Sequence, residues 1–409
     1  MNWKKIKLGE ILKNREGRYK PNDPTITGLK RINKINFLGE IYLSEKKSNT
    51  DMILIKKGDL VISGINVEKG ALAIYEGNED ILATIHYSSY IFEKNKIDID
   101  FLKIFLKSPD FIQLLKEQVP GGIKTEIKPK HLLPLEVYFP ENIEDQKTIA
   151  FTYFKKEALI NQINEHISHQ LTHIENLTQA ILQEAVQGKL VPQDPNDEPA
   201  TELLKRIKAE KKKVDNAKKQ KPLPPIKPEE IPFEIPDSWM WCRLGEIIDM
   251  FYGESLIKTQ RTDNGKYPVF GSNGIVGYHD KYLTDKRTII VGRKGSAGAL
   301  NVCQTPSWTT DVAYYIEEET LSDFDFTYYL LKSLKIEELA KGVKPGINRN
   351  EVYNIPIPLP PLLEQKRIVA EIEKQLAKTE ELKKYITSNQ ESTEQLLKAL
   401  LHEAFEGGK

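Results

Sequence analysis

Glycine-rich loops that carry cations and small polar side chains are the segments of this sequence best suited to binding a ligand. The clearest is residues 292–298, where Arg293, Lys294 and Ser296 stand among three glycines. Backbone N–H groups beside glycine can approach a phosphate or a base edge closely, and arginine and lysine donate hydrogen bonds to both. The loop is therefore a candidate nucleic-acid contact, although the same composition is also typical of solvated turns.

Comparable segments occur in both halves of the sequence. The second half adds a Phe-Gly-Ser-Asn-Gly turn at residues 270–274 and a glycine-flanked basic segment at residues 342–349, while the first half has a basic run at residues 30–34. Cations at matched places in two divergent halves suggest a shared role. The predicted DNA-contacting residues are Lys30, Arg31, Asn33, Lys34, Lys69, Lys124, Ser272, Asn273, Arg293, Lys294, Ser296, Lys344, Asn348 and Arg349.

Motifs for catalysis are weak or missing. The sequence has no Asn/Asp-Pro-Pro-Tyr/Phe motif of amino-methyltransferases and no Walker phosphate loop. Asp110, Glu126 and Lys128 fit a loose nuclease pattern that would bind Mg²⁺, but the spacing in that pattern is unconstrained and only one half of the chain has it. We therefore predict a non-catalytic chain with no cofactor or metal site of its own.

An internal repeat shows which elements must position these loops. Leu-Gly-Glu-Ile at residues 8–11 recurs at residues 244–247, an offset of 236. Gln-Lys-Thr-Ile at residues 146–149 returns as Gln-Lys-Arg-Ile at residues 365–368, an offset of 219. The same offset relates Glu-Ala-Val-Gln-Gly, which ends at Gly188, to Glu-Ala-Phe-Glu-Gly, which ends at Gly407. The stretch between these anchors has a constant length, whereas the globular parts upstream have diverged in length.

The constant stretch has the heptad pattern of two long helices, each ending in a glycine that can adopt the left-handed cap conformation. Each helix alone has too narrow an apolar stripe to be stable in water, so we predict that the two pack against each other. The predicted helix–helix seam consists of Ile160, Ile163, Ile167, Gln170, Ile174, Leu177, Ile181, Ile372, Leu382, Ile386, Asn389, Leu396 and Leu400. His166, His169 and His173 share one helix face beside this seam, for which a partner-facing surface is favoured over a metal site.

The two helices are expected to run antiparallel and to relate the halves by a pseudo-twofold axis, with the globular domains at opposite ends. Forty residues at about 1.5 Å each span roughly 60 Å, enough to hold two DNA-reading domains about one helical turn of DNA or more apart. Dimerisation with another chain through these helices is the alternative.

The predicted fold class is α+β, with two mixed domains in tandem. Runs at residues 59–64 and 287–292 resemble buried strands that end in glycine, and residues 101–119 and 324–339 have helical periodicity. Residues 191–236 form a proline-rich basic linker with a short helix, which is predicted to be a surface tether that could contact DNA phosphate. The predicted segments are globular domain 1 at 1–142, helix 1 at 143–190, the linker at 191–236, globular domain 2 at 237–361 and helix 2 at 362–409.

Composition excludes several classes of protein. Lys+Arg and Asp+Glu both total 59, so any nucleic-acid surface must be a local patch. No run of eighteen apolar residues and no secretory leader is evident, which predicts a cytoplasmic protein. Cys242 and Cys303 are too few for a four-thiolate zinc site and are read as packing residues.

Several segments resemble the specificity subunits of type I restriction-modification enzymes. Residues 356–369, which include Pro-Leu-Pro-Pro-Leu-Leu-Glu-Gln-Lys-Arg-Ile, resemble the segment that opens the conserved helical region in that family, and residues 135–149 look like a degenerate copy of it. Residues 184–199 are similar to the family's central junction, and residues 267–274 to a segment of its recognition domains. The likeness covers essentially the whole chain.

This resemblance implies a function and a set of partners. Each globular domain would read one half of a bipartite double-stranded DNA site, and the helices would dock two modification subunits that carry S-adenosylmethionine and methylate adenine. Restriction subunits would add the ATP- and Mg²⁺-dependent nuclease. The rival hypothesis is a coiled-coil scaffold that joins protein partners without reading DNA.

Overall fold

The structure is a computed structural model that describes residues 1–37, 39–46, 48–67, 71–93, 95–118, 126–214, 222–318, 321–343 and 345–406. The chain forms two compact units. The first contains Met1–His169 and Thr387–Lys409, and the second contains Gln170–Ile386. Each unit is therefore built from one globular domain and parts of both long helices.

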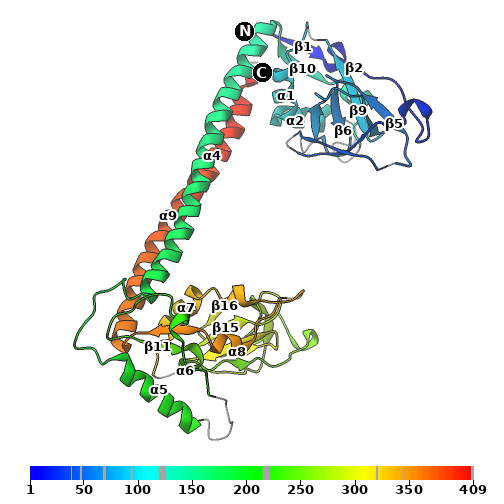
Figure 1. Cartoon of the computed structure of the whole chain (residues 1–409). Coiled ribbons are helices and arrows are strands. Elements are labelled where there is room, and N and C mark those ends of the chain that lie inside the picture. Colours follow the sequence, from blue (N-terminus) through cyan, green and yellow to red (C-terminus); the bar gives the residue numbers. More distant parts are fainter. Residues whose placement is uncertain are drawn as a thin grey trace. The chain divides into compact units, whose positions relative to one another are not determined.

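The first unit is a β-rich domain with short helices (Figure 1). Its elements are β1 (Trp3–Lys7), β2 (Leu12–Asn14), β3 (Arg31–Ile35), β4 (Ile41–Ser44), β5 (Met52–Ile55), β6 (Leu60–Ser63), β7 (Leu72–Ile74), β8 (Ile81–Thr84), β9 (Tyr87–Phe92), α1 (Ile99–Lys107), α2 (Pro109–Gln118), α3 (Pro129–Leu132), β10 (Glu136–Pro140) and the start of α4 (Ile143–Val186). The single helix expected at residues 101–119 is two helices, because Pro109 cannot continue α1 and instead begins α2.

The second unit has a similar order of elements, preceded by the segment that follows α4, but no described strand corresponds to β5 and a 3-10 helix at Ile336–Leu339 stands in place of α2. Its elements are α5 (Ala200–Val214), β11 (Met240–Arg243), α6 (Leu244–Ile247), β12 (Phe251–Tyr252), β13 (Tyr267–Gly271), β14 (Gly274–His279), β15 (Thr288–Gly292), β16 (Leu300–Cys303), β17 (Trp308–Thr309), β18 (Ala313–Glu317), α7 (Phe324–Ser333), α8 (Arg349–Tyr353), β19 (Pro356–Leu359) and the start of α9 (Leu362–Glu403).

Sheet topology repeats between the two domains. An antiparallel sheet with strand order β2-β9-β6-β7 in the first domain corresponds to β12-β18-β15-β16 in the second. A second sheet contains one parallel pair in each domain, β3 with β8 and β13 with β17. A two-stranded ribbon, β1 with β10 and β11 with β19, leads into each long helix. The expected α+β class and tandem repeat are confirmed, with the buried strands β6 and β15 in equivalent places.

A buried glutamine joins each globular domain to its long helix. Gln146, near the start of α4, accepts from Asp98 N at 2.8 Å and donates to Pro140 O at 2.9 Å. Gln365, near the start of α9, accepts from Asp323 N at 3.0 Å and donates to Pro360 O at 3.0 Å. The two aspartates cap α1 and α7, so each glutamine ties together a ribbon, a domain helix and a long helix. We call this arrangement the glutamine clamp.

The long helices α4 and α9 pack together antiparallel, as predicted (Figure 1). In the first unit Lys156 Nζ lies 3.1 Å from Glu403 Oε2, and Thr393 Oγ1 donates to Asn164 Oδ1 at 2.6 Å. Rising numbers on α4 therefore meet falling numbers on α9. At the end of α4, Gly188 has φ +71° and Lys189 N donates to Glu184 O, the left-handed cap expected there. Gly407 lies outside the described residues.

Half of the predicted seam faces inward and half does not. The first-position residues Ile160, Ile167, Ile174, Ile181, Ile372, Ile386 and Leu400 are buried. The predicted second-position residues Ile163, Gln170, Leu177, Leu382, Asn389 and Leu396 are exposed, so their assignment to the seam is wrong. The second contact row instead lies four residues after the first, at the half-buried Asn164, Leu171 and Thr178. Residues three and four positions after a first-position residue both lie next to it on the helix surface, so either row could complete the seam. The polar Asn164 can lie in the interior because it accepts a hydrogen bond there.

The linker is not a loose tether in the part that the structure describes. Leu203, Leu204 and Ile207 of α5 are buried in the core of the second unit. The ammonium of Lys211 donates to Ile248 O at 2.7 Å and lies 3.2 Å from Asp249 Oδ1, so this lysine is engaged with protein instead of being available to phosphate. Residues 215–221, which include Lys218, Lys219 and Lys221, lie outside the described residues.

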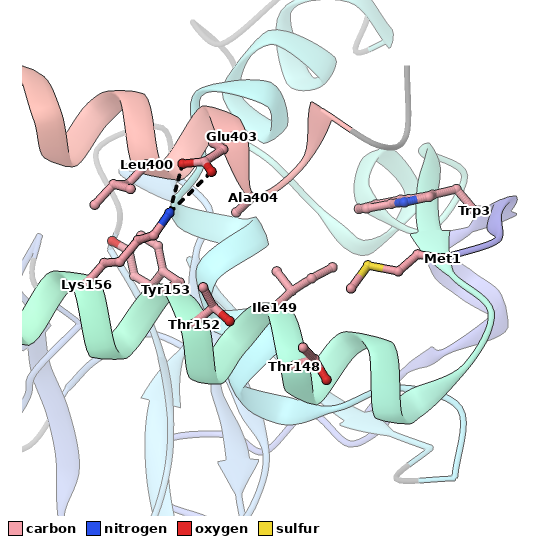
Figure 2. Close-up of a pocket in the computed structure, with 10 residues that line it drawn as sticks. All are labelled: Met1, Trp3, Thr148, Ile149, Thr152, Tyr153, Lys156, Leu400, Glu403 and Ala404. Atoms are coloured by element: carbon pink, nitrogen blue, oxygen red, sulfur yellow. Dashed lines mark hydrogen bonds and ion pairs between the residues drawn. The ribbon is translucent and has the colours of Figure 1, made fainter.

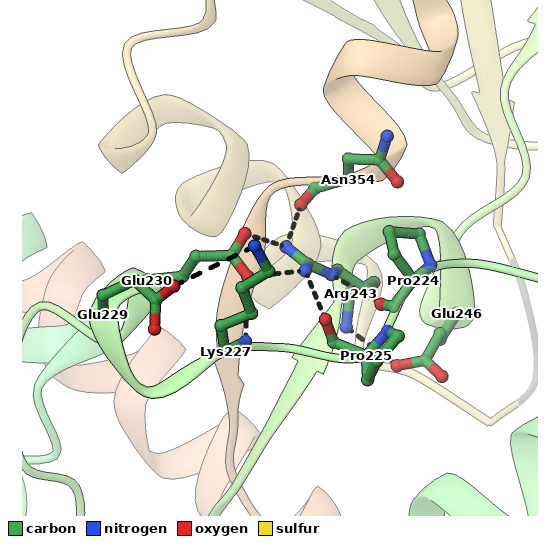
Figure 3. A network of polar contacts seen from close by, with 8 residues as sticks. All are labelled: Pro224, Pro225, Lys227, Glu229, Glu230, Arg243, Glu246 and Asn354. Atoms are coloured by element: carbon green, nitrogen blue, oxygen red, sulfur yellow. Dashed lines mark hydrogen bonds and ion pairs between the residues drawn. The ribbon is translucent and has the colours of Figure 1, made fainter.

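Arg243 fixes the proline-rich part of the linker (Figure 3). Its buried guanidinium donates to Glu230 through two nitrogens at 2.8 and 2.9 Å, and to the carbonyls of Pro224, Pro225 and Asn354 at 2.6–3.1 Å. Hydrogen bonds from Arg243 lower the pKa of Glu230 to about 2, so the pair is charged at neutral pH. The linker therefore belongs to the second globular domain as a bound strap.

Replacing Gln365 by alanine is expected to destabilise the second unit by about 1–3 kcal/mol. The change leaves the N–H of Asp323 and the carbonyl of Pro360 without their buried partner. Urea unfolding followed by the fluorescence of Trp239, Trp241 and Trp308 measures this. Gln375→Ala is the control, because Gln375 is only half-buried on the same helix and among the described residues bonds to Glu371 alone, and it should change the unfolding free energy by less than about 0.5 kcal/mol. Equal effects of the two changes would contradict the clamp.

Candidate nucleic-acid interface

Three loops of the second domain meet at the end of β15. The loop after Gly292 packs against the β13–β14 turn, since a Cβ on Gly292 would lie 2.5 Å from the backbone oxygen of Ser272. It also contacts the segment before α8: Gly295 N donates to Pro345 O at 3.0 Å, and Ile347 N donates to Arg293 O at 3.1 Å. The structure thus brings together candidates that lie far apart in the sequence.

Two arginines in this region flank one tyrosine. The guanidinium carbon of Arg293 lies 5.0 Å from the ring centroid of Tyr252, and that of Arg349 lies 4.8 Å from the same ring. Arg293 also donates to Asp311 O, and Arg349 to Met250 O, each at 3.0 Å. Nε of Arg349 is buried and has no hydrogen-bond partner among the described residues. The pair holds positive charge over a half-exposed aromatic face.

The remaining second-domain candidates surround this cation–aromatic cluster. Asn273, Lys294 and Ser296 are exposed, and Ser272 is partly buried. Asn348 caps α8, because its Oδ1 accepts from Asn350 N at 2.8 Å. Lys344 lies outside the described residues. We call Tyr252, Ser272, Asn273, Arg293, Lys294, Ser296, Asn348 and Arg349 the second-domain site.

Tyr252 was not among the sequence candidates. The available signal was its place in Phe-Tyr-Gly at residues 251–253, where Gly253 matches Gly17 at the repeat offset of 236. Aromatic side chains exposed beside arginine are typical of binding surfaces, since a large apolar ring left in water has an unfavourable free energy.

The first-domain candidates are less concentrated. Lys30 lies 3.8 Å from Glu45, and Lys34 lies over the ring of Tyr42 at 4.8 Å. Arg31 donates to Lys46 O at 2.6 Å and to Ile32 O, so its guanidinium supports the β3–β4 hairpin. Asn33 is exposed. Lys69 and Lys124 lie outside the described residues. Nothing in these contacts gathers the four described candidates into one site.

The loose nuclease pattern does not form a site among the described residues. Asp110 Oδ2 lies 3.7 Å from His402 Nδ1, whereas Glu126 contacts His86 and Lys128. Within the described part of the chain, no group of three His, Cys, Asp or Glu residues is placed to hold a metal ion. The three histidines of α4 are among the residues to which this applies. Nor is any described helix long and apolar enough to span a membrane.

The residues that line a small hollow in the first unit are not arranged for catalysis either (Figure 2). It has a volume of about 240 Å³ and lies where Trp3 and Ile149 face the end of α9. Its charged residues, Lys156 and Glu403, are paired with each other and open to solvent. The hollow is a gap between packed helices with a polar rim.

Sequence comparison identifies related proteins. A family model described as the type I restriction modification DNA specificity domain matches residues 236–391. The EcoAI specificity subunit of Escherichia coli is 32% identical over 276 residues, which are 58% of this chain and 46% of that protein. The EcoEI specificity subunit of the same species is 34% identical over 199 residues, 38% of this chain and 33% of that protein. The chain thus spans less than half the length of these relatives.

Comparison of structures agrees at the level of fold. A chain from a structure concerning complex assembly and conformational transition of the type I R-M system has a TM-score of 0.73, with 18% identity over 100% of this chain and 98% of that one. The HsdS subunit from Thermoanaerobacter tengcongensis has a TM-score of 0.56, with 18% identity over 100% of this chain and 97% of that one. Residues 236–391 thus match the DNA specificity domain of type I restriction-modification systems, the chain is similar to the specificity subunits EcoAI and EcoEI, and its repeated domains and paired helices have the fold of the two solved structures.

Proposed function

We propose that the chain recognises a bipartite double-stranded DNA site, each globular domain reading one half. The observation that carries this proposal is a framework that repeats within the chain while its loops differ. The strand order of the antiparallel sheet, the ribbons and the glutamine clamps repeat, whereas the loops at the ends of β6 and β15 differ in composition. A repeated framework with different loops is what we expect of two domains that recognise different DNA sequences.

The second-domain site has the chemistry to read DNA directly. Arginine and lysine pair with guanine O6 and N7, and asparagine pairs with adenine N6 and N7. Arg293 and Lys294 follow a buried strand, and Asn273 lies on the neighbouring turn, so these donors share a rigid support. Rigid placement is needed because base readout depends on geometry as well as charge.

The long helices are proposed to set the distance between the two half-sites. Helix α4 is continuous over 44 residues, or about 66 Å at 1.5 Å per residue. Because the glutamine clamps fix the start of each long helix to a globular domain, a change in helix length should be transmitted to the domains.

Two apolar patches on the helices are proposed to dock modification subunits. Ile163 and Leu396 of the first unit are 46% and 49% exposed, and Leu177 and Leu382 of the second unit are 45% and 51% exposed. Each pair lies at opposed register positions on α4 and α9, given that Lys156 meets Glu403. Similar exposure at repeat-related positions favours two equivalent partners, because neighbouring exposed apolar side chains that recur in the same register on both halves form two like candidate contact surfaces.

The partners would supply the chemistry that this chain is proposed to lack. Modification subunits would bring S-adenosylmethionine and methylate adenine, and restriction subunits would bring ATP- and Mg²⁺-dependent cleavage, so we propose no cofactor on this chain and a role in the cytoplasm. A scaffold that joins partners without reading DNA would use the same helix patches. The two functions differ in whether a sequence is selected.

Selection from random duplex DNA, with the modification subunit supplied, is expected to enrich a bipartite site. Arg293→Glu with Lys294→Glu should abolish the preference for one half-site and leave the other intact, since these residues serve one domain. The control Lys258→Glu with Lys281→Glu changes the same charge on the same domain away from the second-domain site. If no bipartite site is enriched by the wild-type chain, the scaffold hypothesis holds.

Removing one heptad from each helix is expected to shorten the gap between half-sites by about three base pairs. Deleting residues 168–174 and 385–391, which keeps the exposed apolar residues of both patches, removes facing stretches and about 10 Å of helix, against about 3.4 Å per base pair. The same selection measures the gap. A deletion variant that assembles and keeps the wild-type gap would rule out a spacing role for the helices.

Removing one apolar patch is expected to release one of two modification subunits. Ile163→Ser with Leu396→Ser should leave the chain folded, because both side chains are about half exposed, while the mass of the complex falls by one subunit. Mass photometry of the purified complex measures this, with Glu165→Ser and Lys398→Ser as the exposed polar control. Full occupancy in the patch variant would exclude Ile163 and Leu396 from docking.

A further inference from the structure

The first domain contains a cavity that none of the predicted DNA-contacting residues line. It has a volume of about 510 Å³ and is bordered by Arg15, Arg18, His86, Glu126 and Lys128, together with Asn14, Glu16, Gly17, Ile53, Ile85, Tyr87, Ser88 and Pro129. Unlike the β3–β4 hairpin, it gathers several charged and polar side chains in one concave place.

Backbone hydrogen bonds put this cavity in the same position as the second-domain site. Ile127 N donates to Gly64 O at 2.8 Å, just after β6. Ile347 N donates to Arg293 O at 3.1 Å, just after the equivalent strand β15. The residues beside Ile127 therefore occupy the places that the residues beside Ile347 occupy in the second domain.

Helix starts give the same alignment. Lys128 is the N-cap of α3 and Asn348 is the N-cap of α8, each directly after the isoleucine that makes the bond described above. On the other side of the site, Gly17 matches Gly253 at the repeat offset, which places Glu16 where Tyr252 lies. Lys128 is thus the first-domain counterpart of Asn348, which the sequence predicts as a DNA contact. The sequence repeat alone did not identify Lys128 in this role.

The chemistry of the cavity differs from that of its counterpart. Glu126 Oε1 lies 3.0 Å from His86 Nδ1, and Glu126 Oε2 lies 3.3 Å from Lys128 Nζ. Partial burial raises the pKa of Glu126, but hydrogen bonds from His86 and Lys128 lower it overall, so the carboxylate is ionised at neutral pH. The guanidinium of Arg15 donates to Asp59 Oδ2 at 2.5 Å and to Asp59 Oδ1 at 2.7 Å, so it stabilises the domain. Arg18 is exposed.

From this geometry, we infer that the cavity is the base-reading site of the first domain, and that Glu126, oriented by His86 and Lys128, accepts a hydrogen bond from an exocyclic amino group in the major groove. Carboxylates read the N4 amino group of cytosine, and cations beside them can contact neighbouring phosphates or guanine. The inference rests on the proposed function and assigns the first half-site to residues other than Lys30–Lys34. It also accounts for unlike half-sites, because the site of one domain presents a held carboxylate and the site of the other presents arginines.

The test is selection from random duplex DNA by the complex of the full chain with its modification subunit. Glu126→Gln keeps the shape of the side chain but replaces one acceptor oxygen by a donor. It should weaken the preference at one base pair of one half-site by about 5- to 100-fold and leave the other half-site unchanged. Glu45→Gln, the same change at an exposed residue of the β3–β4 hairpin, should leave the selected sequence unchanged.

Two further variants keep the test decisive if Glu126→Gln fails to fold. Arg18→Ala changes an exposed side chain and should reduce selection of the same half-site; Lys30→Ala with Lys34→Ala should leave the base preferences intact. If Arg18→Ala and Glu126→Gln both select the wild-type sequence with wild-type affinity, the cavity is not the reading site. In that outcome the wild-type bipartite selection still stands, whereas a wild-type complex that selects no sequence would refute the proposed function itself.

Discussion

The architecture depends on satisfying the polar groups where a β-ribbon, a capped domain helix and a long helix converge. Gln146 and Gln365 do this with a single side-chain amide each, whose oxygen accepts the N–H of a helix-capping aspartate and whose nitrogen donates to the last carbonyls of the ribbon. Both glutamines are at most 1% exposed. An unsatisfied group at such a depth costs about 1–3 kcal/mol, so the geometry of the junction is narrowly constrained.

That constraint separates what is fixed in the chain from what varies. The clamp residues, the ribbons and the helix lengths repeat, the four-stranded antiparallel sheet keeps its strand order, and the second sheet of each domain keeps one parallel pair. Loops at the ends of β6 and β15 lie outside the clamp and contribute little to it. Side chains such as Arg293 and Glu126 can therefore differ between the domains without disturbing how either domain joins its helix.

The sequence predicted the repeat, the α+β class and the helix pair because those depend on periodicity and on anchors such as Gln146 and Gln365. It did not predict which of two neighbouring rows completes the helix contact. Ile163 and Leu177 are more apolar than Asn164 and Thr178, yet the polar row lies inward, since Asn164 finds a partner in Thr393 on the other helix. Hydrophobicity alone cannot identify a buried polar pair formed by residues more than two hundred positions apart.

Tertiary contacts also determine which further residues join the candidate sites, and these residues were not predicted from the sequence. Tyr252 became evident only because Arg293 and Arg349 converge on its ring, and Lys128 only because α3 and α8 begin at equivalent places. The lysines of the linker illustrate the opposite error, since Lys211 is engaged by Ile248 and Asp249. A run of cations in a sequence shows charge but not whether that charge is already used.

The even charge balance of the chain gives these local arrangements their importance. With 59 cations and 59 anions there is no overall field to hold the chain on DNA, so non-specific attraction by net charge is weak. For the proposed DNA-reading function, affinity must then come from concentrated sites and from the proposed partners on the same DNA. A reader with little general attraction to the phosphate backbone depends more on base contacts, which favours discrimination between sequences over tight binding to all of them.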